Sequence, residues 1–263
     1  MARNIFDLVF ILPPKRISIK ETAVKLISLL EILRIEDNVF SKFKVSKLHF
    51  KSVEFNLEDN SFEKSVQKLS DTILRFELPD IKHYEKEENP TIDFSRDHGF
   101  FISFEFQMEN KKHFNLFCNL ASSQKNSLAI ENFPFEKSDY NFDWYFNIFR
   151  KINQYLNPKY SGVNIILPQY MEMYLPLKIV YPLGWVTYFS NESNIKMPFD
   201  GGFEVIQEEK GQYIIATRED FTASKESFFA MKEHLIEGMK LLKERCPEYK
   251  ETETLTQLIL RSI

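Results

Sequence analysis

The chain has 263 residues, a formal net charge of −4, 43% hydrophobic residues and 27% charged residues. This balance is typical of a folded protein with a sizeable core and excludes a disordered chain. The sequence has 26 phenylalanines, only 7 glycines and no Gly-rich phosphate-binding motif, which excludes nucleotide binding through such a loop. The negative charge also argues against a protein that holds nucleic acid through its phosphates.

The first elements are marked by a pair of prolines and a helix-capping sequence. The apolar run before Pro13-Pro14 predicts a strand over residues 5–12. Ser18 and Glu21 have the spacing of a capping box, in which a hydroxyl and a carboxylate bind the free amides of a helix start. Apolar residues at helical spacing then predict a helix that ends near Ile35.

The next region predicts a strand, a helix and a loop. Residues 46–57 alternate loosely between apolar and polar side chains and predict one strand with a single irregularity. A helix is expected from Ser61 to Phe76, ended by Pro79, because proline removes a backbone donor and clashes with the preceding turn. The polar, acidic segment 80–97 is expected to be a long exposed loop.

The middle of the chain predicts a group of strands and an aromatic helix. The expected strands are 100–108, 114–120, 127–132 and 163–167, and side chains of the first alternate between an apolar and a mostly polar side. Residues 140–156 predict the helix, closed by Asn157-Pro158. Cys118 is expected to be a buried free thiol, and Cys246, just before Pro247, is expected near the surface. Two cysteines so far apart predict no disulfide and a reducing compartment.

The last third predicts strands at 185–189, 203–208 and 212–217 and a helix over 223–245. The apolar face of this helix is expected to be Phe228 or Phe229, Met231, Leu235, Met239 and Leu242. Residues 99–156 follow the same order of strand, strand, strand and helix. The spacings differ, and antiparallel α+β proteins often show this order, so coincidence is favoured over duplication. The expected fold class is α+β, an antiparallel sheet covered by helices, in a single domain 1–263. Two similar strand-strand-strand-helix units, or sub-units 1–158 and 159–263, are the alternatives.

No constellation of residues points to catalysis or to a metal. The five histidines are scattered, and there is no H-E-x-x-H, C-x-x-C or G-x-S-x-G motif. Arg96, Asp97 and His98 could form a polar site, although Asp-His-Gly before a strand is more often a turn. We therefore expect no catalytic residue, no metal and no cofactor.

The N-terminal apolar stretch does not predict a signal peptide, because it is short, Asp7 interrupts it and no small-residue cleavage site follows. No apolar run approaches the roughly 18 residues that a membrane helix needs. Together with the cysteine count, these features predict a cytoplasmic protein whose partners include neither a membrane nor nucleic acid.

An acidic segment is the first candidate for a protein-binding surface. Residues 54–95 carry eleven acids against five bases, and Glu85, Glu87 and Glu88 lie close together in this segment. A solvated loop is the simpler interpretation of this charge run. The alternative is an acidic surface that meets a basic partner.

The aromatic helix is the second candidate. Residues 140–156 contain more aromatic side chains than a single core-facing stripe can bury. Tyr140 and Tyr145 are therefore candidates for contacts with a partner, since aromatic residues are favoured interface anchors. A helix buried on two sides is the other interpretation.

The stretch 183–220 contains the most informative pattern. It reads Leu-Gly-Trp-Val-Thr-Tyr-Phe from 183 to 189, then a loop with Pro198, then Gly-Gln-Tyr-Ile-Ile-Ala-Thr from 211 to 217. With Glu219-Asp220-Phe221 and a last helix containing His234, it resembles the immunity protein 52 family of bacterial polymorphic toxin systems. The resemblance covers roughly residues 160–245. The residues that carry it are expected to be structural, with Trp185 and Tyr188 packing the sheet and Gly211 serving a turn: Gly184, Trp185, Tyr188, Pro198 and Gly211.

The resemblance implies a non-enzymatic protein that binds and neutralises one cognate toxin, as a monomer or homodimer. In that family the toxin is often a nuclease of the restriction-endonuclease fold, delivered by contact-dependent secretion such as type VI secretion. A negatively charged protein suits the capture of a basic nuclease, because complementary fields speed association.

Two other functions stay open. The first is an enzyme or small-ligand-binding domain of unknown substrate, with a pocket at the sheet edge near residues 96–98 or near the Trp185 strand. The second is a scaffold protein within a larger assembly.

Overall fold

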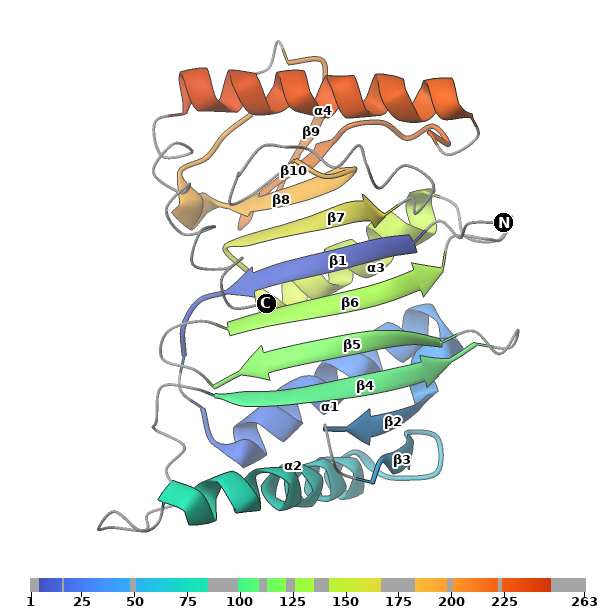
Figure 1. The fold of residues 1–263 in the computed structure, drawn as a ribbon, viewed down its shortest axis with the longest axis vertical. Helices are drawn as coiled ribbons and strands as arrows, with labels where there is room; N and C mark the ends of the chain where they lie inside the picture. Colours follow the sequence, from blue (N-terminus) through green and yellow to red (C-terminus); the bar gives the residue numbers. More distant parts are fainter. Residues whose placement is uncertain are drawn as a thin grey trace. The chain divides into compact units, whose positions relative to one another are not determined.

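The computed structural model describes residues 5–15, 17–47, 51–84, 99–108, 113–121, 126–134, 142–166, 183–197, 201–221 and 224–246. Within these ranges, four α-helices and ten strands make an α+β fold with antiparallel strand pairs, which confirms the expected fold class (Figure 1). The chain divides into two compact units. The N-terminal unit is residues 11–133, and the C-terminal unit is residues 134–263 together with 1–10. The expected single domain and its alternative sub-units stay predictions.

The described part of the N-terminal unit contains two α-helices and five strands. Its elements are α1 (Ile19–Glu36), β2 (Lys42–Ser46), β3 (Val53–Asn56), α2 (Phe62–Tyr84), β4 (Phe100–Gln107), β5 (His113–Leu120) and β6 (Asn126–Pro134). The strands lie in the order β3-β2-β4-β5-β6, and each neighbouring pair is antiparallel. The predicted capping box is confirmed, since the Ser18 hydroxyl accepts from the Glu21 amide and the Glu21 carboxylate accepts from the Ser18 amide.

Phenylalanine rings fill the core of the N-terminal unit. Phe106 and Phe114 stack with 4.9 Å between ring centroids, and the ring of Phe40 packs edge-on against both. Along β4, buried residues alternate with exposed or half-buried ones, as the sequence predicts, and β5 shows the same alternation. Because successive side chains of a strand point to opposite faces, only one face of these strands meets the core.

The described part of the C-terminal unit also contains two α-helices and five strands. Its elements are β1 (Ile5–Leu12, of which residues 5–10 belong to this unit), α3 (Phe142–Leu156), β7 (Tyr160–Ile166), β8 (Val186–Ser190), β9 (Glu204–Gln207), β10 (Gly211–Ile215) and α4 (Lys225–Arg245). The strands lie in the order β1-β7-β8-β10-β9. The pairs β7–β8, β8–β10 and β10–β9 are antiparallel.

Both helices of the C-terminal unit end or pack as the sequence predicts. Asn157 follows α3 with a φ of 49°, and its amide donates to the carbonyl of Asn153 at 2.8 Å, which closes the helix. Helix α4 buries the apolar stripe that its spacing predicts. The stripe is Phe228, Met231, Leu235, Met239 and Leu242.

The region between α1 and β4 differs from the prediction. The sequence predicts one irregular strand over 46–57, but β2 and β3 are two antiparallel strands whose buried rings, Phe43 and Phe55, stack at 5.1 Å. Helix α2 runs past Pro79 to Tyr84, because the lost donor and the clash of a single proline with the preceding turn can kink a helix without ending it. Residues 80–84 of the expected loop therefore belong to α2, and its residues 85–97 lie outside the described residues.

Both cysteines are buried, and neither forms a disulfide. Cys118 is a buried free thiol, as predicted. The expectation that Cys246 lies near the surface is wrong, since this residue is only 7% exposed. Its Sγ lies 3.1 Å from the carbonyl oxygen of Lys196, because the end of α4 packs onto the unit instead of projecting from it.

Gly211 is the first residue of β10, and its φ lies outside the left-handed region. The glycine is needed here for space. A Cβ at this position would lie 2.4 Å from the carbonyl oxygen of Phe189 and 2.7 Å from the ring of Tyr188. The absence of a side chain therefore lets β10 approach β8 closely.

Replacing Gly211 by alanine should lower the free energy of unfolding by about 1–3 kcal/mol, the usual cost of forcing an extra carbon into a packed site. Urea unfolding of the purified variant measures this loss. Glu209→Ala, an exposed change in the same hairpin, should stay within about 0.5 kcal/mol of the parent. Equal unfolding midpoints for the two variants would show that the close approach is not required.

Candidate functional site

The indole of Trp185 is the centre of an aromatic cluster in the C-terminal unit. Trp185 is 2% exposed, and its ring packs against Phe142, Tyr145 and Phe221 at centroid distances of 5.3, 5.8 and 5.2 Å. Its Nε1 donates a hydrogen bond to the carbonyl of Thr217 at 2.8 Å. One side chain thus holds the start of α3 and the segment after β10 in fixed positions.

The main chain of Trp185 continues the sheet beyond the first residue of β8. Its amide donates to the carbonyl of Val163 at 3.0 Å, and its carbonyl accepts from the amide of Ala216 at 3.0 Å. Beside it, the amide of Gly184 donates to the hydroxyl of Thr187 at 2.9 Å. The start of β8 is therefore anchored on both sides by hydrogen bonds.

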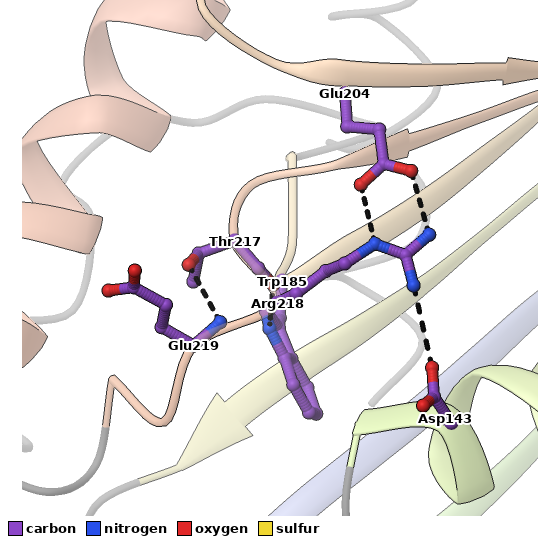
Figure 2. Close-up of polar contacts among 6 residues, drawn as sticks. All are labelled: Asp143, Trp185, Glu204, Thr217, Arg218 and Glu219. Atoms are coloured by element: carbon purple, nitrogen blue, oxygen red, sulfur yellow. Dashed lines mark hydrogen bonds and ion pairs between the residues drawn. The ribbon is translucent and has the colours of Figure 1, made fainter.

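An exposed ion cluster lies beside this aromatic core. The guanidinium of Arg218 donates to both carboxylate oxygens of Glu204 at 2.7 Å, and to Oδ1 of Asp143 at 3.4 Å (Figure 2). The guanidinium also lies over the ring of Phe142, with Cζ 4.9 Å from the ring centroid. Since its members come from α3, from β9 and from the segment after β10, the cluster forms only when the unit is folded.

The ion pair shifts the ionisation of both partners. The hydrogen bond from Arg218 lowers the pKa of Glu204, and the bond to Glu204 raises the pKa of Arg218. Both side chains are almost half exposed, so water screens the attraction and the pair adds little to stability. The bidentate geometry mainly fixes the orientation of a planar guanidinium at the surface.

Acidic residues predominate in the surrounding segment. Residues 204–220 carry five acids against two bases. Glu209 and Glu219 are exposed. The amide of Glu219 donates to the hydroxyl of Thr217 at 3.0 Å, which fixes the backbone next to Arg218 (Figure 2). This edge of the C-terminal unit therefore presents one aligned arginine among several carboxylates.

A polar cavity of about 230 Å³ lies at the turn end of the β9–β10 hairpin. Its lining residues are Asn153, Gln154, Tyr188, Glu208, Glu209, Lys210 and Tyr213. The hydroxyl of Tyr188 donates to the carbonyl of Lys210 at 3.1 Å, whereas that of Tyr213 is buried and has no hydrogen-bond partner among the described residues. Burial, reinforced by the charge of Glu208, raises the pKa of Tyr188 to about 12 and also raises the pKa of Tyr213.

Several residues that the sequence singles out lie outside the described residues. They are Glu85, Glu87, Glu88, Arg96, Asp97, His98, Tyr140 and Pro198. Tyr145 is described and is only 1% exposed, with its ring against Trp185. Its role in partner binding stays a prediction, and a partner could reach this ring only if it left the core.

The sequence does not single out the ion cluster. Arg218 lies 14 residues from Glu204 and 75 residues from Asp143 along the chain. The sequence signal that could have identified the pair is the predicted hairpin of strands 203–208 and 212–217. In the structure, its register pairs Ile215 with Glu204 and so brings the residues after β10 near that carboxylate.

Neither a metal site nor a membrane-spanning helix is found among the described residues. No group of three or more histidine, cysteine, aspartate or glutamate side chains in the described ranges could hold a metal ion. In the same part of the chain, no helix has the length and apolar character to cross a membrane.

Comparison with known proteins gives matches among solved structures. No known protein family matches the chain, and no curated protein matches it. Among solved structures, the Pseudomonas aeruginosa T6SS protein PA0821 matches with a TM-score of 0.48 and 9% sequence identity, over 97% of this chain and 83% of that chain. A similarity this low supports no inference about function. Membership of the immunity protein 52 family therefore stays a prediction.

The two cavity tyrosines should respond differently to loss of their hydroxyls. Tyr188→Phe removes a hydrogen bond and should lower the free energy of unfolding by about 1 kcal/mol. Tyr213→Phe removes a hydroxyl without a partner among the described residues, so stability should be unchanged or slightly higher. Urea unfolding at pH 7 compares the two variants, and an equal loss in both would contradict the assignment.

Stability should also fall at alkaline pH. A tyrosine whose pKa is about 12 in the folded chain, and about 10 when unfolded, favours folding below pH 10. This contribution is lost as the pH rises from about 10 toward 12. Unfolding midpoints measured across this range should fall, and the double variant Tyr188→Phe, Tyr213→Phe should fall less steeply. Parallel curves for parent and variant would show that the tyrosines do not cause the fall in stability.

Proposed function

We propose that this protein is a non-enzymatic immunity protein that binds and neutralises a cognate bacterial toxin with a basic surface, such as a nuclease. The observation that carries the proposal is the exposed Arg218 cluster, in which one guanidinium is held by Glu204 and Asp143 against a rigid aromatic core. The resemblance of roughly residues 160–245 to the immunity protein 52 family supports a toxin as the partner.

The cluster has the physical properties of a recognition site. Arginine is enriched among the residues that dominate binding energy at protein interfaces. A side chain that is already aligned loses little conformational freedom when a partner binds, so more of the contact energy appears as affinity. The carboxylates of residues 204–220 would at the same time attract a basic partner and set its orientation.

Neutralisation could follow from either of two events. The bound protein could cover the toxin's catalytic surface, or it could prevent the toxin from assembling. Delivery of that toxin by type VI secretion, and action of this protein in the cytoplasm, belong to the same proposal.

A second candidate function is binding of a small polar ligand. The unpartnered hydroxyl of Tyr213 favours it, because a buried hydroxyl without a hydrogen bond is costly and a ligand in the cavity could supply one. The cavity, at about 230 Å³, is smaller than the usual small-molecule site. A set of small amides and amines that raises the melting temperature of the parent, and not that of Tyr213→Phe, would favour this function.

The test of immunity is co-expression with the toxin encoded beside this gene. Cells that produce the toxin should survive only when this protein is also produced. Arg218→Ala should weaken toxin binding about 30-fold, the loss expected for a hot-spot residue worth about 2 kcal/mol. Isothermal titration calorimetry measures the affinity.

Arg150→Ala is the matched control. Arg150 belongs to the same unit, its side chain is 45% exposed against 46% for Arg218, and it also pairs with a carboxylate, that of Glu208. Its loss should not weaken toxin binding, because it removes no contact of the Arg218 cluster and leaves the carboxylate of Glu208 in place. Equal effects of the two variants would remove the Arg218 cluster from the interface, and cells that die with and without the protein would refute immunity itself.

A further inference from the structure

The strand register of the N-terminal unit places one set of side chains on the face opposite the phenylalanine core. In β4, the residues of this face are those that alternate with the buried Ile102 and Phe104. The pairing carries the same face across β5 and β6, since Ser103 pairs with Phe117 and Asn115 pairs with Glu131. We call this surface the open sheet face, and its members are Phe101, Ser103, Glu105, Asn115, Phe117 and Glu131.

An aromatic pair lies on the open sheet face. Phe101 is 53% exposed, and its ring stacks on that of Phe117 with 6.1 Å between centroids and 18° between planes. The residues opposite Phe117 on the two neighbouring strands are Ser103 and Ala129. Because these two neighbours are small, no large side chain lies directly opposite the Phe117 ring on either strand, and Phe101 lies opposite Asn119. Contiguous exposed apolar surface is one of the features that mark interaction sites.

Next to the rings, a row of residues paired across β4, β5 and β6 contains carboxylates. Glu105 and Glu131 both pair with Asn115, from the two strands that flank β5. Oε1 of Glu105 lies 3.4 Å from Nδ1 of His113, and both side chains are more than 40% exposed. Glu131 is exposed as well. The nearest lysine in this row, Lys44, already lies 3.5 Å from the carboxylate of Glu54. The row therefore has more negative than positive charge.

We propose that the open sheet face binds a basic protein surface, with an arginine of the partner stacked on the Phe101–Phe117 pair and paired with Glu105 or Glu131. This inference rests on the proposed function and identifies a second surface for the same toxin.

The chemistry of the face selects a guanidinium. A planar guanidinium stacks on aromatic rings and forms bidentate pairs with carboxylates, and a lysine ammonium cannot do both. Phe117 pairs with Ser103 and Ala129, and Glu105 and Glu131 lie two residues farther along those two strands. Diagonal neighbours of this kind are about 7–8 Å apart, so one arginine side chain can span the Phe117 ring and either carboxylate. The chain already contains this combination within its C-terminal unit, where Arg218 lies over Phe142 and pairs with Glu204 and Asp143.

The experiment measures binding of the toxin encoded beside this gene to purified full-length variants by calorimetry. Phe101→Ala should weaken the affinity at least tenfold, and Glu131→Lys should weaken it and reduce its dependence on salt. Phe62→Ala and Ile35→Ala are the controls, because these residues are also exposed, at 38% and 81%, but belong to helices α2 and α1. Both controls should bind as the parent does.

A second measurement does not depend on the stability of the alanine variants. The photo-crosslinking residue benzoylphenylalanine, placed at position 101, should form a covalent adduct with the toxin, and the same residue at position 62 should not. A Phe101→Ala variant that binds like the parent, without a crosslink from position 101, would overturn this inference alone. A parent protein that binds no toxin would overturn the proposed function with it. A crosslink that joins two copies of this chain would assign the face to a homodimer instead.

Discussion

The C-terminal unit depends on the hydrogen bond that the indole N–H of Trp185 donates. An indole N–H in a closed aromatic core needs an acceptor, and the carbonyl of Thr217 provides it at 2.8 Å. That bond brings the segment after β10 back toward α3. The next residue, Arg218, thereby lies over Phe142 with its guanidinium between two carboxylates. The exposed charges thus take their positions from a buried hydrogen bond, so that packing and recognition in this unit share one constraint.

The two units use their aromatic residues in different ways. In the C-terminal unit, rings from α3 and from the segment after β10 cover Trp185, which leaves polar groups at the adjacent surface. In the N-terminal unit, phenylalanines alternate with polar residues along β4 and β5, so one face is buried and the other retains Phe101 and Phe117. Period-two alternation therefore specifies the open sheet face as well as the core, since both arise from the same strands.

Local patterns in the sequence predict most of the elements, and long-range placement limits the rest. The capping box at Ser18, the alternation of β4 and the stripe of α4 are each contained in one short segment, and each is confirmed. Whether Pro79 ends a helix depends on the packing of the whole helix, which no local pattern reveals. Gly211 next to a lysine suggests a turn, but the lack of room for a side chain beside the Phe189 carbonyl can be inferred only from how β8 and β10 pair.

The placement of the charged side chains also depends on contacts between residues that are distant in the sequence. A net charge of −4 on 263 residues is small, so the field of the whole chain steers a basic partner only weakly. What directs a partner is the local excess of acids, five against two bases over residues 204–220. The positive charge of Arg218 does not offset all the acids of that segment equally, because its guanidinium is paired with Glu204 and Asp143. The carboxylates farther along the hairpin, such as Glu209, remain exposed to solvent. A basic protein would thus meet a fixed pattern of signs, and a pattern discriminates between partners in a way that net charge cannot.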